Sequence, residues 1–193
     1  MENQPENQEL NVSVQDEISA LKARITQLEN KLDDALMIIA DTYRYGKLKD
    51  LLAAGNWDEA DLETTRVMIE ITGRPNMDKI KPDDIQQFPC NAIMLIDQMW
   101  RKYSNDRFGF SIQLKIYQSV GGNMNTIRSQ QNQYLRMTSE KIGWRKDGKL
   151  VSREEYNHSL EAPEGGLPGN WWNSPYGAKM ANFFLARLIA CEL

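Results

Sequence analysis

The chain has 193 residues, of which 41% are hydrophobic and 26% charged, with a formal net charge of −4. This length allows one domain with a sizeable core plus an appendage. The acidic balance argues against a nucleic-acid-binding protein, which normally presents a basic face, and no apolar run is long enough to cross a membrane.

The first residues are polar and charged, so we expect residues 1–11 to form a disordered tail. They lack the basic and then apolar pattern of a secretory signal, which predicts a cytoplasmic location. Residues 12–44 are predicted to form a coiled-coil helix, because apolar residues recur at alternating spacings of four and three. These residues are Val14, Ile18, Leu21, Ile25, Leu28, Leu32, Ala35 and Ile39.

Of the two apolar positions in each seven-residue repeat, the one called a is mostly isoleucine and the one called d includes Leu21 and Leu28. This combination favours a parallel two-stranded coiled coil. The flanking charges agree with this arrangement. In a parallel dimer, Glu17 of one helix would lie near Lys22 of the other, and Arg24 near Glu29, so each pair would have opposite charges. We therefore expect a homodimer through residues 14–39. The alternative is a single amphipathic helix lying on its own domain.

The rest of the chain, residues 45–193, reads as a mostly helical domain. We expect the first helix to end or bend near Gly46 and a helical hairpin to follow, with stops at Gly55 and Gly73. Helical spacing then predicts helices after Pro89 and from Phe108, and a last amphipathic helix at the C-terminus. Between them we expect a polar loop or frayed helix at 123–133, a β-turn at 146–148 inside a small hairpin at 144–152, and a Gly/Pro-rich segment at 157–176. The predicted fold class is all-α with at most a small β-hairpin.

No catalytic machinery is apparent. The single histidine, His158, has no partner at metal-ligand spacing, and neither a nucleophile elbow nor a phosphate-binding loop is present. We expect no enzymatic activity and no protein-ligated metal. Cys90 and Cys191 are far apart in the sequence, and we expect two buried free thiols.

Aromatic and apolar residues are unusually frequent near loops. Met77, Tyr134, Trp171 and Trp172 lie in such stretches, with arginines close to some of them in sequence. For any one aromatic residue, core packing is the simpler reading. A hydrophobic loop surface edged by arginines nevertheless suits a flat apolar ligand that bears carboxylates.

Several tracts together resemble the genomes-uncoupled-four domain. The resemblance runs from about Tyr45 to Cys191 and includes FPC, IDQMWRKYS, RFGFSIQ, IGWRKDG, LEAPEGGLPG and LARLIAC. It implies a compact all-α fold shaped like a cupped hand, found in cyanobacteria, algae and plants. It also implies a tetrapyrrole-binding domain over residues 45–193, and a non-enzymatic protein that binds protoporphyrin IX or Mg-protoporphyrin IX and stimulates magnesium chelatase in chlorophyll biosynthesis.

The resemblance implies further details that we state as expectations. The ligand surface would use the loops 74–80 and 123–136, the partner would be the large subunit of magnesium chelatase, and the location would be cytoplasm or plastid stroma, peripheral to membranes at most. The alternative function is an oligomeric interaction or signalling module that uses the same domain without pigment. The expected porphyrin-binding residues are Arg74, Met77, Ile80, Phe88, Trp100, Arg101, Phe108, Phe110, Tyr134, Arg136 and Trp144, with core packing left open for Trp144.

Overall fold

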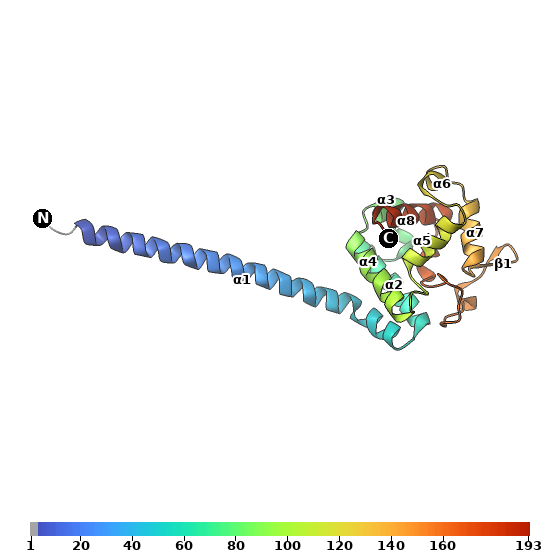
Figure 1. Ribbon diagram of the computed structural model, residues 1–193, viewed down its shortest axis with the longest axis horizontal. Helices are drawn as coiled ribbons and strands as arrows, with labels where there is room; N and C mark the ends of the chain where they lie inside the picture. Colours follow the sequence, from blue (N-terminus) through green and yellow to red (C-terminus); the bar gives the residue numbers. More distant parts are fainter. Residues whose placement is uncertain (1–3) are drawn as a thin grey trace. The chain divides into compact units, whose positions relative to one another are not determined.

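The computed structural model describes the backbone of residues 4–193 and the side chains of residues 14–15, 17–29, 31–32 and 42–193. The chain divides into two compact units, Met1–Gly46 and Lys47–Leu193 (Figure 1). Within the described residues, no helix is long and apolar enough to cross a membrane. The fold is almost entirely helical, as predicted, with one two-stranded sheet.

The first unit consists of a single helix, α1 (Gln4–Ala53), which continues into the second unit. Residues 4–11 are helical, where we expected a disordered tail, while residues 1–3 lie outside the described residues. Pro5 is compatible with a first turn, because its missing N–H would have no acceptor there. The helix also passes through Gly46, where we expected it to end. A glycine costs a helix only about 1 kcal/mol relative to alanine, and the burial of Leu48 and Leu52 outweighs that cost.

The described apolar residues of the heptad lie exposed along α1, with exposed fractions between 37% for Ile18 and 60% for Leu21 and Leu32. The side chains of Ala35 and Ile39, the last two heptad positions, lie outside the described residues. A row of exposed leucine and isoleucine is unfavourable in water unless another surface covers it.

Seven further α-helices and three 3₁₀ helices build the second unit. The α-helices are α2 (Trp57–Thr72), α3 (Pro82–Gln86), α4 (Cys90–Tyr103), α5 (Phe110–Ser119), α6 (Met124–Arg128), α7 (Gln133–Lys141) and α8 (Ala178–Ala190). The 3₁₀ helices are η1 (Met77–Lys79), η2 (Arg153–Glu155) and η3 (Asn170–Trp172). Of the two alternatives expected for 123–133, a polar loop or a frayed helix, the structure has the short helix α6. The Asn123 side chain accepts hydrogen bonds from the backbone N–H groups of Asn125 and Thr126 and caps its first turn.

Helices α4 and α5 supply the centre of the core. Ile93, Ile96 and Trp100 recur at helical spacing on α4, and all three are fully buried. The tight turn into α5 depends on Gly109, whose φ of 134° favours glycine and whose missing Cβ would lie 2.7 Å from a carboxylate oxygen of Asp97. The same carboxylate accepts a hydrogen bond from the backbone N–H of Ser111. This contact fixes where α5 begins.

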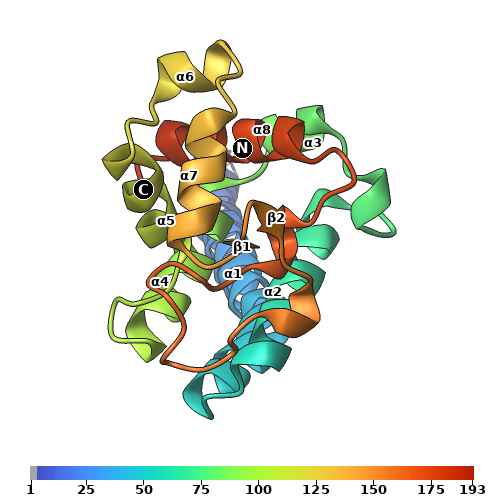
Figure 2. The same cartoon turned by 90° about the vertical axis from the view of Figure 1, so that its right-hand side faces the viewer.

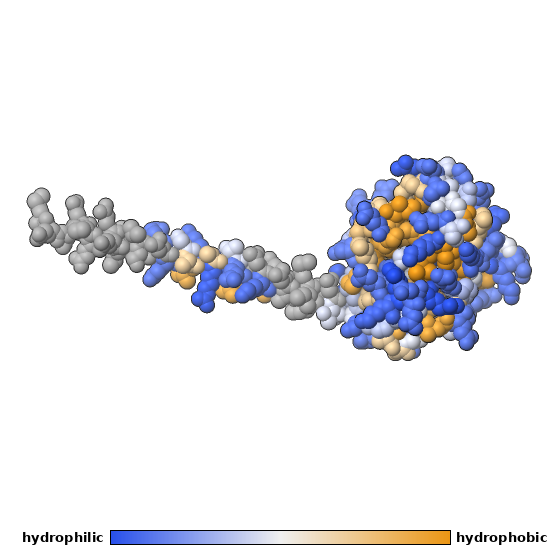
Figure 3. All heavy atoms as spheres, in the orientation of Figure 1, coloured by the Kyte–Doolittle hydropathy of each residue, from blue (hydrophilic) through white to orange (hydrophobic). Residues whose placement is uncertain are grey.

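The hairpin lies where the sequence predicted it. Strands β1 (Arg145–Lys146) and β2 (Lys149–Leu150) pair antiparallel across Asp147 and Gly148, both with positive φ, as a tight two-residue turn requires. In Figure 2, α7 crosses in front of α8 and leads down to this hairpin, with α6 above. Hydrophobic residues also reach the surface of this unit on the face that carries α8 (Figure 3).

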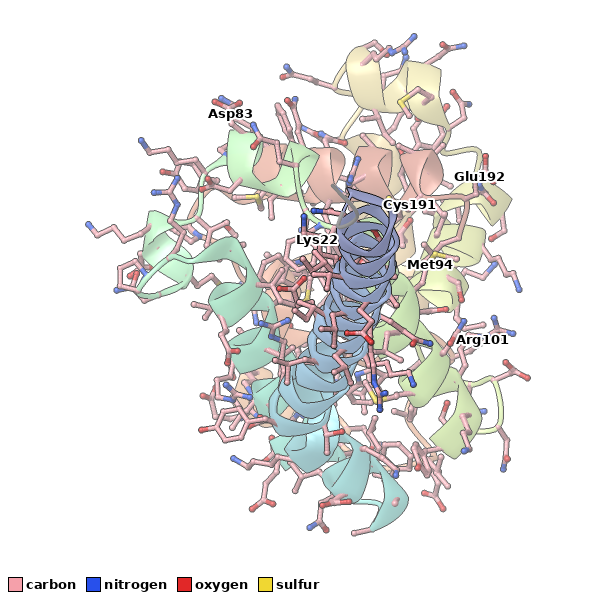
Figure 4. All side chains as sticks on the ribbon, turned by 90° about the vertical axis from the view of Figure 1, so that its left-hand side faces the viewer. Lys22, Asp83, Met94, Arg101, Cys191 and Glu192 are labelled. Atoms are coloured by element: carbon pink, nitrogen blue, oxygen red, sulfur yellow. A yellow bond between two sulfur atoms is a disulfide. The ribbon has the colours of Figure 1, made fainter. Side chains whose placement is uncertain are left out.

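Cys90 and Cys191 form a disulfide across 101 positions of sequence, so the expectation of two free thiols is wrong. Their Cα atoms are 5.3 Å apart because α8 ends beside the first turn of α4. In Figure 4, Cys191 lies at the end of α8, and Met94 and Arg101 follow along α4 on the same side of the unit. Sequence distance carries no information about such a contact, which arises only when the last helix packs.

Candidate functional site

A hollow of about 270 Å³ opens between α5, α7, the β1–β2 hairpin and the start of α8. We call it the tryptophan cleft, because two indole rings, Trp144 and Trp172, form part of its wall. Its other residues are Gln113, Asn132, Leu135, Arg136, Thr138, Ser139, Ile142, Arg145, Leu150, Gly177, Ala178, Ala181 and Leu185. The cleft combines aromatic faces, aliphatic side chains and two guanidinium groups without a lining carboxylate.

The two indoles belong to a layer of aromatic rings. Trp144 and Trp172 have ring centroids 5.7 Å apart, and Tyr156 stacks on Trp144 at 6.4 Å. Trp172 also meets Phe184 of α8 edge to face at 5.1 Å. Each contact of this kind adds roughly 0.5 to 1.5 kcal/mol beyond area burial, so the rings hold one another in place.

Buried hydrogen bonds fix the tryptophans further. Gln113 is 2% exposed on α5, and its side-chain NH₂ donates to the carbonyls of Gly165 and Pro168 at 3.0 and 2.9 Å. Its side-chain oxygen accepts from the indole N–H of Trp172 at 3.0 Å. The indole N–H of Trp144 donates to the carbonyl of Gly166 at 2.8 Å. One buried amide thus ties α5, the Gly/Pro-rich segment at 157–176 and an indole of the cleft together.

The 3₁₀ helix η3, which carries Trp172, is anchored to α2. Asp61 is fully buried, and its carboxylate accepts the backbone N–H of Asn170 at 3.0 Å. The side-chain NH₂ of Asn170 donates to the hydroxyl of Thr65, also at 3.0 Å. These bonds hold η3, and with it Trp172, against α2. Asp61 is therefore a supporting residue for the cleft, although it does not line it.

Burial raises the pKa of Asp61 to about 7, against the opposing effect of the N–H groups of Asn170 and Gly169. The neighbouring His158 has Nε2 at 4.0 Å from Asp61 and 3.5 Å from Asp58. Burial, and then Arg153, lower the pKa of His158. Both groups thus favour their neutral form in the folded protein.

We expect the Asp61 carboxyl to make the free energy of unfolding depend on pH. An acid whose pKa rises on folding stabilises the protein most below its unfolded value of 3.8, and this contribution is lost as pH rises towards 7. The advantage of the wild type over Asp61→Asn should therefore shrink by up to about 1.4 kcal/mol per pH unit between pH 4 and 7, and stay constant above. Urea unfolding at each pH measures it. His158 acts in the opposite direction and is present in both proteins, so the comparison rests on the difference between the two slopes. Equal slopes for the two proteins would refute the assignment.

The two arginines of the cleft differ in their partners. Arg145 donates to the hydroxyl of Ser139 and to the carbonyl of Gly148, so its charge is held at the hairpin. Arg136 is exposed, and no carboxylate among the described residues pairs with its guanidinium. Guanidinium groups without a carboxylate partner are suited to bind carboxylates of a ligand in bidentate fashion.

The structure brings two of the sequence-predicted binding residues into this cleft, Arg136 and Trp144. Tyr134 is half-buried nearby on α7, with its ring against Gly121. Five others are core residues with at most 1% exposure and cannot line a surface in this conformation: Ile80, Phe88, Trp100, Phe108 and Phe110. Their burial has a plain cause, since the aromatic rings pack on one another and the indole N–H of Trp100 donates to Thr64.

The remaining predicted residues lie apart from the cleft. Arg74 is exposed and paired with Asp84, its Nη2 at 2.6 Å from the carboxylate, and this pairing lowers the pKa of Asp84. Arg101 pairs with Asp106 at 2.7 Å. Met77 is half-buried in η1. Both arginines are thus already engaged by carboxylates, which sequence proximity alone did not indicate.

Gln113, Arg145 and Trp172 were missed as site residues. Trp172 was noted in its loop, but a Gly/Pro-rich segment gives no clue to which surface it meets. Gln113 carried a usable signal, because a glutamine inside an apolar helix must find buried partners. Among the described residues, no group of three His, Cys, Asp or Glu side chains could hold a metal ion.

Comparison with known proteins places this geometry in context. A family model described as GUN4-like matches residues 39–183. The ycf53 protein of Cyanidium caldarium is 28% identical over 129 residues, which are 65% of this chain and 50% of that protein. The "Tetrapyrrole-binding protein, chloroplastic" of Arabidopsis thaliana is 34% identical over 83 residues, 38% of this chain and 28% of that protein. The chain spans about half the length of the curated relatives it matches, and less of the Arabidopsis protein.

Among solved structures, the ligand-free structure of Arabidopsis thaliana GUN4 has a similar fold. It aligns with a TM-score of 0.58 and 25% sequence identity, covering 74% of this chain and 94% of that one. The residues that the family model matches, 39–183, include α2 to α7 and the hairpin, and so most of the cleft.

Proposed function

The chain belongs to the GUN4-like family, and from this premise we propose that it binds a tetrapyrrole in the tryptophan cleft. The observation that supports this most directly is the combination of two indole faces with two guanidinium groups in one hollow. A tetrapyrrole is a flat apolar macrocycle with carboxylates at its edge. Indole faces suit the macrocycle, and arginines suit the carboxylates.

The size of the cleft limits how such a ligand sits. Pockets that enclose a drug-sized ligand usually measure about 300 to 1,000 Å³, and the cleft is slightly smaller at about 270 Å³. One edge of the macrocycle would therefore lie in the cleft, against Trp144 and Trp172, while the opposite edge stays outside. Arg136, which is exposed at the cleft, would then bind a propionate.

Protoporphyrin IX and Mg-protoporphyrin IX are the proposed ligands. No histidine or cysteine lines the cleft, among the described residues that surround it. Trp144 and Trp172 would contact the macrocycle of either porphyrin and Arg136 a propionate, and the macrocycle itself would bind the magnesium. The protein's part is to bind and orient the pigment, and the tetrapyrrole supplies the light absorption and the metal-binding macrocycle.

Titration with deuteroporphyrin tests this function, followed by tryptophan quenching and the Soret band. We expect saturable binding in the wild type and about tenfold weaker binding by Arg136→Ala, because a charge-assisted hydrogen bond is lost. Arg128→Ala removes an exposed arginine outside the cleft and is the matched control. A wild type without saturable binding would support the pigment-free interaction module instead, and equal losses in both variants would move the site away from the cleft.

We further propose that the pigment-loaded protein stimulates magnesium chelatase in chlorophyll biosynthesis by contact with its large subunit, without doing the chemistry itself. Membership of the GUN4-like family supports this extension. The test is a chelatase assay with and without this protein and porphyrin. Stimulation should require both, and Arg136→Ala should need about tenfold more porphyrin for the same effect.

The exposed heptad of α1 supports a second proposal, a parallel homodimer through residues 14–39. Full-length protein should be dimeric by light scattering, and Leu21→Glu with Leu28→Glu should make it monomeric, because carboxylates at these apolar heptad positions would be buried against each other. Ala20→Glu with Gln27→Glu adds the same charge on the opposite face of the helix and should leave the dimer intact. A dimer that survives the first pair of substitutions would contradict the coiled coil.

A further inference from the structure

A second hollow, of about 370 Å³, lies on another face of α8 from the tryptophan cleft. We call it the α8 groove. Its lining comes from the end of α3, from α6 and the turn after it, and from α8. The lining residues are Gln86, Met124, Ile127, Arg128, Gln130, Lys179, Asn182, Phe183, Ala186, Arg187 and Ala190. The proposed tetrapyrrole site shares none of these residues.

The groove is elongated, because its floor follows one stripe of α8. Lys179, Phe183, Ala186 and Ala190 are spaced four, three and four residues apart, which places them on one side of a helix. Eleven residues at 1.5 Å each give a stripe about 16 Å long. The two alanines keep the floor low, while α3 and α6 both contact α8 and form its sides.

The apolar part of the groove is aliphatic rather than aromatic. Met124 and Ile127 contribute from α6, and Phe183 is its one ring among the described residues. Methionine and isoleucine adapt to a flexible chain, whereas the paired indole faces that suit a flat macrocycle are absent from this lining. The shape and chemistry therefore fit an extended acyl chain better than a planar ligand.

Three cations, Arg128, Lys179 and Arg187, are part of the groove's lining, and no carboxylate lines it. Among the described residues, neither Arg128 nor Lys179 has an ion-pair partner. Arg187 donates its Nε to the backbone carbonyl of Phe88 at 2.7 Å, which orients the guanidinium but leaves its charge uncompensated. Three uncompensated cations at one apolar groove are notable in a chain with a net charge of −4. They favour an anionic head group.

The groove is also held in shape without a ligand. Asn182 donates to the side chain of Asn132 at 3.1 Å, which ties α8 to the start of α7. The disulfide between Cys90 and Cys191 fixes the end of α8 next to Ala190. Preformed apolar hollows with a few converging polar groups are the usual form of small-molecule sites.

We infer that the α8 groove binds a free long-chain carboxylate, with its acyl chain along Phe183, Ala186 and Ala190 and its head group at the cations. Such a ligand would let the protein respond to a free fatty acid as well as to a tetrapyrrole. The two sites lie on adjoining faces of α8 but have different linings, so their ligands can be tested separately.

Isothermal titration calorimetry of the full-length protein with dodecanoate, below its critical micelle concentration, tests the inference. We expect saturable binding of one molecule per chain. Butyrate has the same head group without the long chain, and dodecanol has the chain without the charge; both should bind at least tenfold more weakly. Absence of dodecanoate binding, or equal binding of butyrate, overturns the proposal. Binding to anionic phospholipid vesicles without binding of free dodecanoate also overturns it, since that result indicates a membrane surface.

Single substitutions test the apolar lining of the groove and its charges separately. Arg128→Ala should weaken dodecanoate binding about tenfold, and Ala186→Trp should abolish it by filling the groove. Met124→Glu, at the first position of α6 where a carboxylate is compatible with the helix, should also abolish it. The urea midpoint of each variant reports its folding. Arg136→Ala, in the tryptophan cleft, should leave dodecanoate binding unchanged; a loss there, or full binding by the two groove-filling variants, contradicts the assignment.

Loss of porphyrin binding does not affect this test. A protein that binds dodecanoate but no deuteroporphyrin would refute the tetrapyrrole proposal and leave the α8 groove in place. The converse result would refute the groove alone. Arg128→Ala and Arg136→Ala therefore serve as each other's controls, because each removes one exposed arginine from one site only.

Discussion

Removing the Cys90–Cys191 disulfide is expected to lower the free energy of unfolding by about 3 to 5 kcal/mol. The bond closes a loop across 101 positions, and the chain-entropy model assigns about 4.7 kcal/mol to a loop of roughly that length at 25 °C. The part of the second unit from α4 to α8 lies inside this loop, whereas α2 and α3 precede it. Without the disulfide, the unfolded chain could adopt many more conformations.

The measurement is urea unfolding of the oxidised protein and of the double variant Cys90→Ser, Cys191→Ser. Replacing both residues avoids an unpaired thiol. A reducing agent should destabilise the wild type and leave the double variant unchanged, which controls for effects of the reagent itself. Two free thiols found by titration of the folded protein without reductant would show that the bond is absent and remove the prediction.

Replacing Gln113 by leucine is expected to cost about 2 to 4 kcal/mol of stability and to weaken deuteroporphyrin binding about tenfold. The substitution leaves the carbonyls of Gly165 and Pro168 and the indole N–H of Trp172 without their buried partner. Each unsatisfied buried group costs roughly 1 to 3 kcal/mol. Trp172 is only half-buried, so water can replace part of its lost bond.

Gln118→Leu is the matched control, since Gln118 lies on the same helix but is exposed. We expect it to change stability by no more than about 0.5 kcal/mol and to leave binding unchanged. Both variants are compared at a temperature where each is fully folded, so that a binding loss reports the position of Trp172. If Gln113→Leu binds porphyrin like the control, then Trp172 does not act in the site.

The sequence was informative about local structure. Heptad spacing, apolar spacing on α4 and α5, and the Asp147-Gly148 turn each depend on residues close together in the chain, so periodicity and turn chemistry were sufficient. The errors arose where local rules compete. A helix was expected to end at Gly46, but the burial of Leu48 and Leu52 exceeds the small cost of one glycine.

The site was only partly accessible from the sequence. Counting aromatics found the correct residue type, yet Phe88, Trp100, Phe108 and Phe110 are as apolar in the core as they would be in a cleft. A side chain's composition does not say which face of the domain it meets. Arg74 and Arg101 show the same limit for charges, since their partners were decided by the packing of a loop and a turn.

By itself, the sequence determined the helical class, the heptad, the hairpin and the family to which the chain belongs, because these follow from local patterns and from short tracts of residues. The tertiary structure alone decided three features: the Cys90–Cys191 bond, the binding of η3 by Asp61, and the pairing of Trp144 with Trp172 beside Arg136. Each joins segments from distant parts of the chain. Such contacts exist only where α8 and the Gly/Pro-rich segment pack on the core, and the residues involved carry no mark of their partner in the sequence.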